Sequence, residues 1–318
     1  MPKASSKISG NWVGNPFLLL DDDTAYLRWR DRKLSEHPRN TGDLVVEIRD
    51  LSSLTETEHA EILRRCRQAN MAVYAGPTLS EFSKEDMLAL GSRFGLLRLD
   101  KNMLADDDGI TPLAVSEGES GRNGVRRKYI PYTDHPISWH TDGYYNPPER
   151  TVRGLMLHCV RPAQDGGSND LIDPEIVYIR LRDESADHIQ ALMRPDAMTI
   201  PANDEEGFGS RPDGSGPVFS VNAADGTLHM RYTHRVRNIR WSPAPAVTAA
   251  VAALHRVLAS ADPFLFQHRL APGQGLICNN VLHTRTGFTD DTSRPRLLYR
   301  ARYFDRVAGT ENWRIHER

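Results

Sequence analysis

The sequence has no apolar run long enough to cross a membrane. Its first apolar stretch, Phe17 to Leu20, stops at three consecutive aspartates, and no later stretch approaches the ~20 apolar residues that span a bilayer. Residues 1–10 are polar and lack the apolar centre of a secretion signal. These absences predict a cytoplasmic protein that does not associate with membranes.

Cysteine is also scarce. The three cysteines, Cys66, Cys159 and Cys278, are far apart in the sequence and form no Cys-x-x-Cys pair. This spacing argues against both a disulfide framework and a structural zinc site. Each cysteine has apolar neighbours, so we expect small buried side chains of the kind that a reducing cytoplasm permits.

Positive charge is not in excess either. The 318 residues contain 40 Lys and Arg against 42 Asp and Glu, a formal net charge of −2. Proteins that bind nucleic acid or an anionic membrane surface usually carry a basic excess, so neither partner is predicted. The length and the 39% hydrophobic content suit one large globular domain.

Residues 44–100 predict a compact α/β portion. Residues 44–48 and 71–74 are short apolar strands. Two helices are expected between and after them, each opened by a capping box: Thr55 with Glu58, and Ser83 with Asp86. Residues 101–130 lack periodicity and are rich in Asp, Gly, Ser and Arg. Two interpretations of this segment stay open, a loop that closes over an active site and a plain surface loop.

From residue 138 onward, short strands predominate. The pattern predicts strands at 154–160, 218–221, 228–236, 275–279 and 296–304, and helices at 176–182, 186–193 and 243–259. This mixture indicates a mainly β fold with helical insertions, built on a double-stranded β-helix or jelly roll. We assign residues 1–43 to an N-terminal extension and residues 44–318 to a single domain.

Residues 139–143, Trp-His-Thr-Asp-Gly, place an imidazole and a carboxylate two positions apart. On an extended segment the side chains of His140 and Asp142 point to the same face and could bind one cation together. His283 follows a later apolar strand and is the best candidate for a third ligand. Two histidines and one carboxylate form the facial triad of iron(II) oxygenases. A His-x-Asp pair alone also occurs in surface turns, so the prediction depends on all three residues.

Three arginines follow His283. Arg294, Arg296 and Arg300 share one face of the predicted strand. A buried arginine is costly unless it is paired, and its guanidinium matches a carboxylate with two parallel hydrogen bonds. A bound dicarboxylate such as 2-oxoglutarate would supply that partner.

These motifs, in this order, resemble the taurine dioxygenase superfamily, which also contains γ-butyrobetaine hydroxylase. The likeness runs from about residue 44 to residue 306 and includes Arg-Phe-Gly at 93–95, the Gly-Gly turn at 165–169 and Val-Leu-His-Thr-Arg at 281–285. The resemblance implies an oxygenase that uses iron(II), 2-oxoglutarate and O₂, with the metal on His140, Asp142 and His283.

The resemblance also implies contacts to 2-oxoglutarate. Arg300 is expected to anchor its distal carboxylate, Arg296 to form a second cationic site, and Asn169 to make a further contact. Two extra residues within 289–292 leave Arg294 or Arg296 open as the anchor.

Residues after the first metal motif are candidates for the substrate pocket. Tyr144, Tyr145 and Asn146 could line it, or the tyrosines could be a packed pair at the rim. Arg231 lies on the basic face of the strand at 228–236; a solvated basic face is favoured over a wall that attracts an anion. His135 is expected in a turn and His158 in the core.

We therefore expect a dioxygenase that hydroxylates a small polar metabolite, or demethylates, desaturates or cleaves it, and releases succinate and CO₂. The carboxylate of Asp142 argues against halogenation, because related halogenases have a small residue there. Two alternatives stay open: a zinc hydrolase on the same ligands and a non-catalytic jelly roll that binds an anion. The substrate is open, with an anion favoured by the arginines and a cationic amine by the tyrosines. Relatives commonly form dimers or tetramers, so a homo-oligomer is expected.

Overall fold

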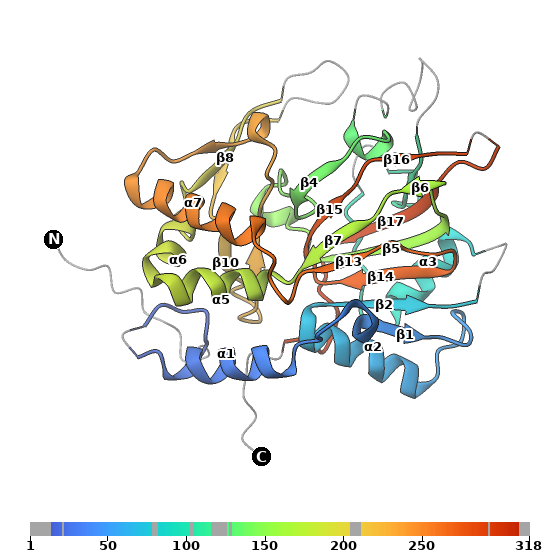
Figure 1. Cartoon of the computed structure of the whole chain (residues 1–318), viewed down its shortest axis with the longest axis horizontal. Coiled ribbons are helices and arrows are strands. Elements are labelled where there is room, and N and C mark those ends of the chain that lie inside the picture. The colour runs from blue at the N-terminus through green and yellow to red at the C-terminus, as the bar shows by residue number, and fades with distance from the viewer. Residues whose placement is uncertain are drawn as a thin grey trace.

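Two β-sheets packed face to face, with helices outside them, form the body of the molecule (Figure 1). The computed structural model describes residues 14–20, 22–77, 82–101, 105–115, 126, 129–203, 211–291 and 293–311. No helix among these residues is long and apolar enough to cross a bilayer.

The larger sheet has six strands in the order β1-β2-β14-β5-β17-β3. Their bounds are β1 Val45–Glu47, β2 Met71–Ala75, β14 Gln274–Cys278, β5 Gly154–Arg161, β17 Leu297–Tyr303 and β3 Thr111–Leu113. The smaller sheet has the order β13-β7-β15-β4, with β13 Phe266–His268, β7 Asn169–Ile172, β15 Leu282–Arg285 and β4 Ile137–His140. All neighbouring strands in these two sheets run antiparallel except β1 and β2.

Three clusters of buried apolar side chains fill the spaces between the layers. Between the sheets, Leu157 and Leu298 of the larger sheet meet Leu171 of the smaller one. The outer face of the larger sheet packs on α2, Glu56–Ala69, and α3, Lys84–Ser92. The outer face of the smaller sheet packs on α5, Pro174–Glu184, α6, Ala186–Leu192, and α7, Pro245–Ala259. Each strand therefore contributes alternate side chains to two different cores.

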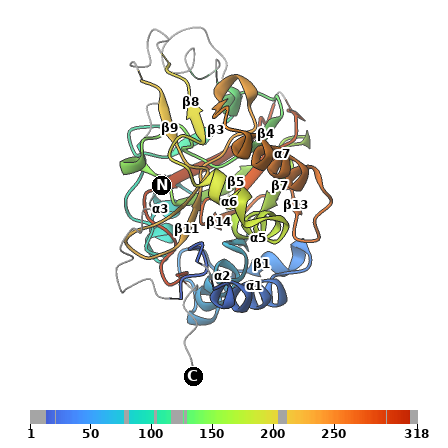
Figure 2. The ribbon, with the colours of Figure 1, turned by 90° about the vertical axis from the view of Figure 1, so that its left-hand side faces the viewer.

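Shorter elements complete the fold. Three further sheets are small: β8 Met198–Ile200 with β9 Gly214–Gly216 and β12 Arg240–Trp241, the hairpin β10 Phe219–Val221 with β11 Leu228–Met230, and β6 Asp165–Gly166 with β16 Phe288–Thr289. The 3₁₀ turns are η2 Thr41–Leu44, η3 Ile130–Tyr132, η4 Pro148–Arg150 and η5 Val236–Asn238. Figure 2 shows β8 and β9 at the end of the molecule opposite α1, Thr24–Glu36.

Most elements predicted from the sequence are present. Both capping boxes form, at Thr55 with Glu58 and at Ser83 with Asp86. The predicted helices at 176–182, 186–193 and 243–259 correspond to α5, α6 and α7, and the predicted hairpin to β10 and β11. His158 is a core residue, 1% exposed and bonded to the Tyr74 hydroxyl.

Two expectations about secondary structure need correction. The second hairpin strand ends at Met230 rather than at 236, and Val236 is 83% exposed in a 3₁₀ turn. Residues 101–130 are not entirely irregular, because β3 pairs with β17 and places Thr111 beside Arg300. Three residues with a central proline carry too weak a pattern to predict a strand. The rest of the loop prediction falls at 102–104, 116–125 and 127–128, outside the described residues.

The helix α1 was not predicted, although it packs firmly on α5. Tyr26 and Trp29 lie in the same buried cluster as Tyr178. The division of the chain at residue 43 stays a prediction.

A buried charge cluster fastens α1 to the smaller sheet. The Lys33 ammonium lies 2.6 Å from carboxylate oxygens of both Asp173 and Glu175, and all three side chains are at most 6% exposed. Asp173 directly follows β7, accepts a hydrogen bond from the backbone N–H of Glu175 and thereby caps α5. Burial would raise the pKa of Asp173, but Lys33 and His37 together outweigh it and hold that pKa well below its usual range. The cluster thus fixes the end of a strand that neighbours β15.

We expect Lys33→Met to destabilise the fold strongly, because it leaves two carboxylates buried without a cation. Loss of one partner of a buried ion pair costs ~3–5 kcal/mol. Arg30→Met is the matched control on the same helix, since Arg30 pairs with Asp31 and Asp183 at the surface, where such pairs contribute ~1 kcal/mol or less. Urea unfolding of the metal-free variants measures both losses. Equal losses would contradict the assigned role of Lys33.

Candidate metal centre

The pairing of β4 with β15 brings two histidines together. His140 and His283 are direct partners in this antiparallel ladder, and their ring centroids lie 4.2 Å apart. The Nδ1 atom of each ring lies 2.9 Å from a backbone oxygen two residues earlier in the chain, that of Ser138 for His140 and of Val281 for His283. If each Nδ1 donates its proton to that oxygen, each Nε2 keeps a free lone pair for a metal ion.

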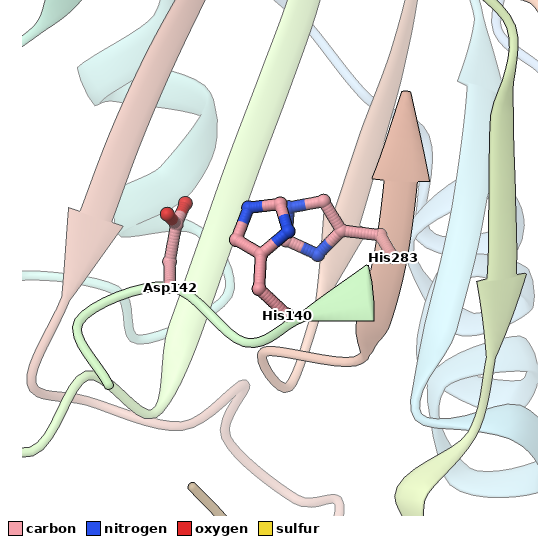
Figure 3. Close-up of side chains that lie close together, drawn as sticks. All are labelled: His140, Asp142 and His283. Atoms are coloured by element: carbon pink, nitrogen blue, oxygen red, sulfur yellow. The ribbon is translucent and has the colours of Figure 1, made fainter. Parts of the chain in front are cut away.

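Asp142 completes the group from the turn that follows β4. One ligand atom from each of His140, Asp142 and His283 lies within 4.8 Å of the others, and no other such group of three occurs in the described ranges. Figure 3 shows the carboxylate and the two rings converging on one space. The Asp142 Oδ2 atom is buried and has no hydrogen-bond partner in the structure. Two imidazole nitrogens and one carboxylate oxygen suit a divalent transition metal such as iron(II) and leave further coordination positions open.

The surroundings hold these three groups in their metal-binding protonation states. Removal from water lowers the pKa of His140 to about 3, and repulsion from His283 adds to this. Removal from water likewise lowers the pKa of His283. Burial would raise the pKa of Asp142, but the positive charges of Arg300 and Arg302 outweigh it and hold that pKa well below its usual range. At neutral pH the site therefore offers two neutral imidazoles and one carboxylate.

Three buried arginines belong to the strands β15 and β17 or to the residue before β17: Arg285, Arg300 and Arg296. The Arg300 Nη1 atom lies 3.3 Å from Asp142 Oδ1. Arg296, 4% exposed, stacks on one side of Phe288, and Arg285 also lies over that ring. Among the described residues, neither Arg285 nor Arg296 has an ion-pair partner within 4.0 Å; the negative charges that act on them are Asp134 for Arg285 and Asp290 for Arg296. A buried guanidinium without a directly bonded carboxylate favours a bound anion.

Arg285 was not identified from the sequence as a site residue. Its guanidinium donates to the backbone oxygens of Thr133 and His135, at 2.7 and 2.6 Å. Burial lowers the pKa of Arg285 to about 9, and Arg296 contributes by repulsion. Its position two residues after His283 on the same strand was a signal that could have pointed to it.

A small cavity brings Asn169 and Arg296 together. Both line it, with Gly167, Arg269 and Leu298. The Asn169 side-chain amide donates one hydrogen bond, 2.6 Å long, to the backbone carbonyl oxygen of Thr284. The Arg296 Nη1 atom has no partner in the structure. Arg300 does not line this cavity. Arg294, the third arginine of the predicted set, is exposed.

The predicted substrate residues lie in different environments. Arg231 is half-buried rather than part of a fully solvated face, and it donates to the backbone oxygens of Tyr144, Met198 and Gly214. The Tyr144 hydroxyl accepts from Asn238, and Asn146 donates to Asp100 and to the Arg150 oxygen. Tyr145 is 36% exposed, and its hydroxyl accepts from Arg302 at 2.8 Å. Of these four residues, Tyr145 therefore presents the most open surface to a ligand.

A second ion pair behind Tyr145 was also missed from the sequence. Arg302 is 2% exposed and lies 2.5 Å from Asp100, which also pairs with Arg150. Asp100 thus ties β17 to the turn at 144–150. The pairing of residues 202 positions apart left no local signal in the sequence.

The model of the taurine catabolism dioxygenase TauD, TfdA family matches residues 31–302. The chain belongs to this family. The match confirms the predicted family and, at the level of the family, the expectation of a dioxygenase that uses iron(II) and 2-oxoglutarate.

Two proteins similar in sequence to this chain are both named uridine-5'-phosphate dioxygenase. A uridine-5'-phosphate dioxygenase from a Streptomyces species is 36% identical over 188 residues, which are 53% of this chain and 64% of that protein. A second, from an Amycolatopsis species, is 32% identical over 176 residues, 52% of this chain and 60% of that protein. The matched region is less than two thirds of the length of either relative.

Solved structures share the fold. An asparagine oxygenase in complex with Fe(II), a hydroxyasparagine and succinate superposes with a TM-score of 0.54 at 14% identity, covering 92% of this chain and 88% of that chain. A taurine dioxygenase from Burkholderia xenovorans gives a TM-score of 0.54 at 15% identity, covering 84% and 89%. At such identities the likeness concerns the architecture alone.

We expect His140→Ala to weaken binding of Mn(II), used as a redox-stable probe, by ~100-fold or more, because one of three protein ligands is lost. His135→Ala is the matched control, five residues earlier in the chain with a ring that is 75% exposed. Isothermal titration of the metal-free proteins measures both affinities. Equal metal affinity of the two variants would show that the triad is not the binding site.

Proposed function

We propose that the protein is an iron(II)- and 2-oxoglutarate-dependent dioxygenase that oxidises a small anionic molecule. The observation that carries this proposal is the convergence of His140, Asp142 and His283, with Arg300 beside Asp142 and a buried Arg296 whose Nη1 atom has no partner. A divalent metal and two anions, the co-substrate and the substrate, would give these groups a function. The two packed sheets are inferred to be the double-stranded β-helix of such enzymes.

His140, Asp142 and His283 would hold the iron. With iron(II), 2-oxoglutarate and O₂ bound, the chemistry supplied is insertion of one oxygen atom into a C–H bond of the substrate and the other into succinate, with release of CO₂. The protein's own residues bind and orient the two organic molecules. Asp142 occupies the position where a carboxylate favours hydroxylation, or an oxidation that follows from it.

Arg296 is proposed as the anchor of the distal 2-oxoglutarate carboxylate, in place of Arg300. Arg300 contacts Asp142, a metal ligand, whereas the distal carboxylate is separated from the chelating end by two methylene groups. Arg296 lies four residues earlier, directly before β17, and lines a cavity with Asn169. Leu298 lies between the two arginines and also lines that cavity, so it could contact the methylene groups.

Arg300 is then available for the substrate. Its position beside Asp142 suits an anionic group next to the carbon that reacts. The names of the two relatives suggest a nucleoside monophosphate. We propose uridine-5'-phosphate as the first substrate to test, with its phosphate on Arg300.

The two alternatives are less well supported. A zinc hydrolase on the same ligands would have no use for Arg296, and a binding module would not need three convergent ligand atoms. Neither agrees with membership of a dioxygenase family. A homo-oligomeric state and a cytoplasmic location stay predictions.

We expect Arg296→Met to weaken 2-oxoglutarate binding by ~30-fold or more, since loss of one partner of a buried charge pair costs ~2–5 kcal/mol. The matched control is Arg294→Met, because Arg294 is exposed on the same segment. Anaerobic titration of the Fe(II) protein with 2-oxoglutarate, followed by its visible charge-transfer band, gives the affinities. A larger loss in Arg300→Met than in Arg296→Met would return the anchor to Arg300.

We expect uridine-5'-phosphate to stimulate succinate formation from 2-oxoglutarate, and uridine to stimulate it at least ~30-fold less, because uridine has no anion for Arg300. Succinate release under air, with an anaerobic control, is the measurement. Equal stimulation by both compounds would exclude the phosphate as the recognised group. Consumption of uridine-5'-phosphate without O₂ and without succinate formation would instead favour a hydrolase.

A further inference from the structure

Asn280 makes an unusual set of contacts to the backbone of Asp142. Its side-chain oxygen accepts a hydrogen bond from the Asp142 N–H, at 2.8 Å. Its amide nitrogen donates to the Asp142 carbonyl oxygen, at 2.9 Å, and to the Val152 carbonyl oxygen, at 2.7 Å. Asn280 is 2% exposed, so none of these bonds competes with bulk water.

The three candidate ligands are held in different ways. His140 and His283 belong to β4 and β15, and the ladder between these strands fixes their relative position. Asp142 lies beyond the end of β4 and outside that ladder. Both of its backbone hydrogen-bonding groups go instead to Asn280, which lies three residues before His283.

The Asn280 side chain thus makes the two backbone hydrogen bonds to Asp142 that a residue on a neighbouring strand would otherwise make. In an antiparallel ladder, a hydrogen-bonded pair of residues exchanges two N–H···O=C bonds. The carboxamide of Asn280 offers the same donor and acceptor to a single residue, Asp142. Asparagine also tolerates the left-handed backbone at this position, φ 52°.

The backbone directly after Asp142 is closely packed. Gly143 has φ 69°, and a Cβ atom there would lie 2.5 Å from the Val152 side chain. The Val152 carbonyl is held by the same Asn280 amide. One side chain therefore fastens both the Asp142 turn and the segment on which it packs.

We propose that Asn280 is a positioning residue that sets the place of Asp142 relative to the two histidines. Its two amide hydrogens and its oxygen are all engaged in the three bonds, so it acts through Asp142 and not as a ligand. This inference rests on the proposed metal centre. Groups that orient metal ligands typically change metal affinity by ~10–100-fold when removed.

Asn279 provides a matched control one residue away. It is also buried, 7% exposed, and also makes three side-chain hydrogen bonds, to Asn70, Thr310 and Val307. None of these partners belongs to the segment that carries Asp142. A general loss of buried hydrogen bonds should therefore affect both asparagines, whereas loss of ligand positioning should affect Asn280 alone.

The experiment compares Asn280→Gly with Asn279→Gly in the full chain, because glycine keeps the left-handed backbone accessible. Mn(II) affinity is measured by titration, and urea unfolding of the metal-free proteins measures stability. We expect Asn280→Gly to weaken Mn(II) binding by ~10–100-fold and Asn279→Gly by less than ~3-fold, even where both lose similar stability. If either glycine variant does not fold, Asn280→Ser and Asn279→Ser take their place.

The outcomes separate this inference from the proposed function. If the unmodified protein binds Mn(II) and both variants lose affinity equally, Asn280 has no special role, and the positioning proposal is overturned while the metal centre stands. If the unmodified protein does not bind Mn(II), the metal centre itself fails, and the inference fails with it.

Discussion

The antiparallel contact between β4 and β15 is the constraint on which the candidate site depends. These strands come from parts of the chain more than a hundred residues apart, and their register makes His140 and His283 direct partners. β15 is fixed on its other edge by β7, where Leu171 is the partner of His283. Leu282, the neighbour of His283, points the other way into the core beneath the helices α5 to α7. Burial of Leu282 therefore forces the imidazole of His283 into the space between the sheets.

The same alternation explains the charge in that space. Leu298 and Arg300 lie on one face of β17, and the packing that buries Leu298 among apolar side chains also places Arg300 next to Asp142. Apolar Leu298 thus has a buried arginine on each side of it in the chain, Arg296 and Arg300. Burial of an arginine without a directly bonded carboxylate is costly, which is the basis for the proposed binding of anions here. The Lys33 cluster and the Asp100–Arg302 pair, by contrast, are already compensated within the chain.

Local patterns in the sequence predicted what depends on neighbouring residues. The capping boxes of α2 and α3 involve side chains three residues apart, and the shared face of His140 and Asp142 follows from an extended segment. Contacts between segments that are distant in the chain produced no recognisable pattern in the sequence. β3 is too short to show a period, α1 is recognisable only by what it packs on, and Asn280 looks like an ordinary loop residue beside Asn279. The family resemblance supplied an order of motifs and assigned the anchor to Arg300, while the two extra residues within 289–292 left Arg294 or Arg296 open.

The sequence by itself determined the chemistry on offer: two imidazoles and a carboxylate in His140, His283 and Asp142, arginines nearby, and the mainly β pattern that carries them. Only the tertiary structure decided how these groups are placed. It separated Arg296, in a cavity with Asn169, from Arg300, beside Asp142, and it set the half-buried Arg231 against backbone oxygens. The reason is that side-chain type and strand period are properties of neighbouring residues in the chain. The distance between two side chains, their burial and the pairing of their charges depend instead on how the two sheets pack on each other. Two arginines on one face of one strand are equivalent in the sequence and become different only when another strand is placed opposite them.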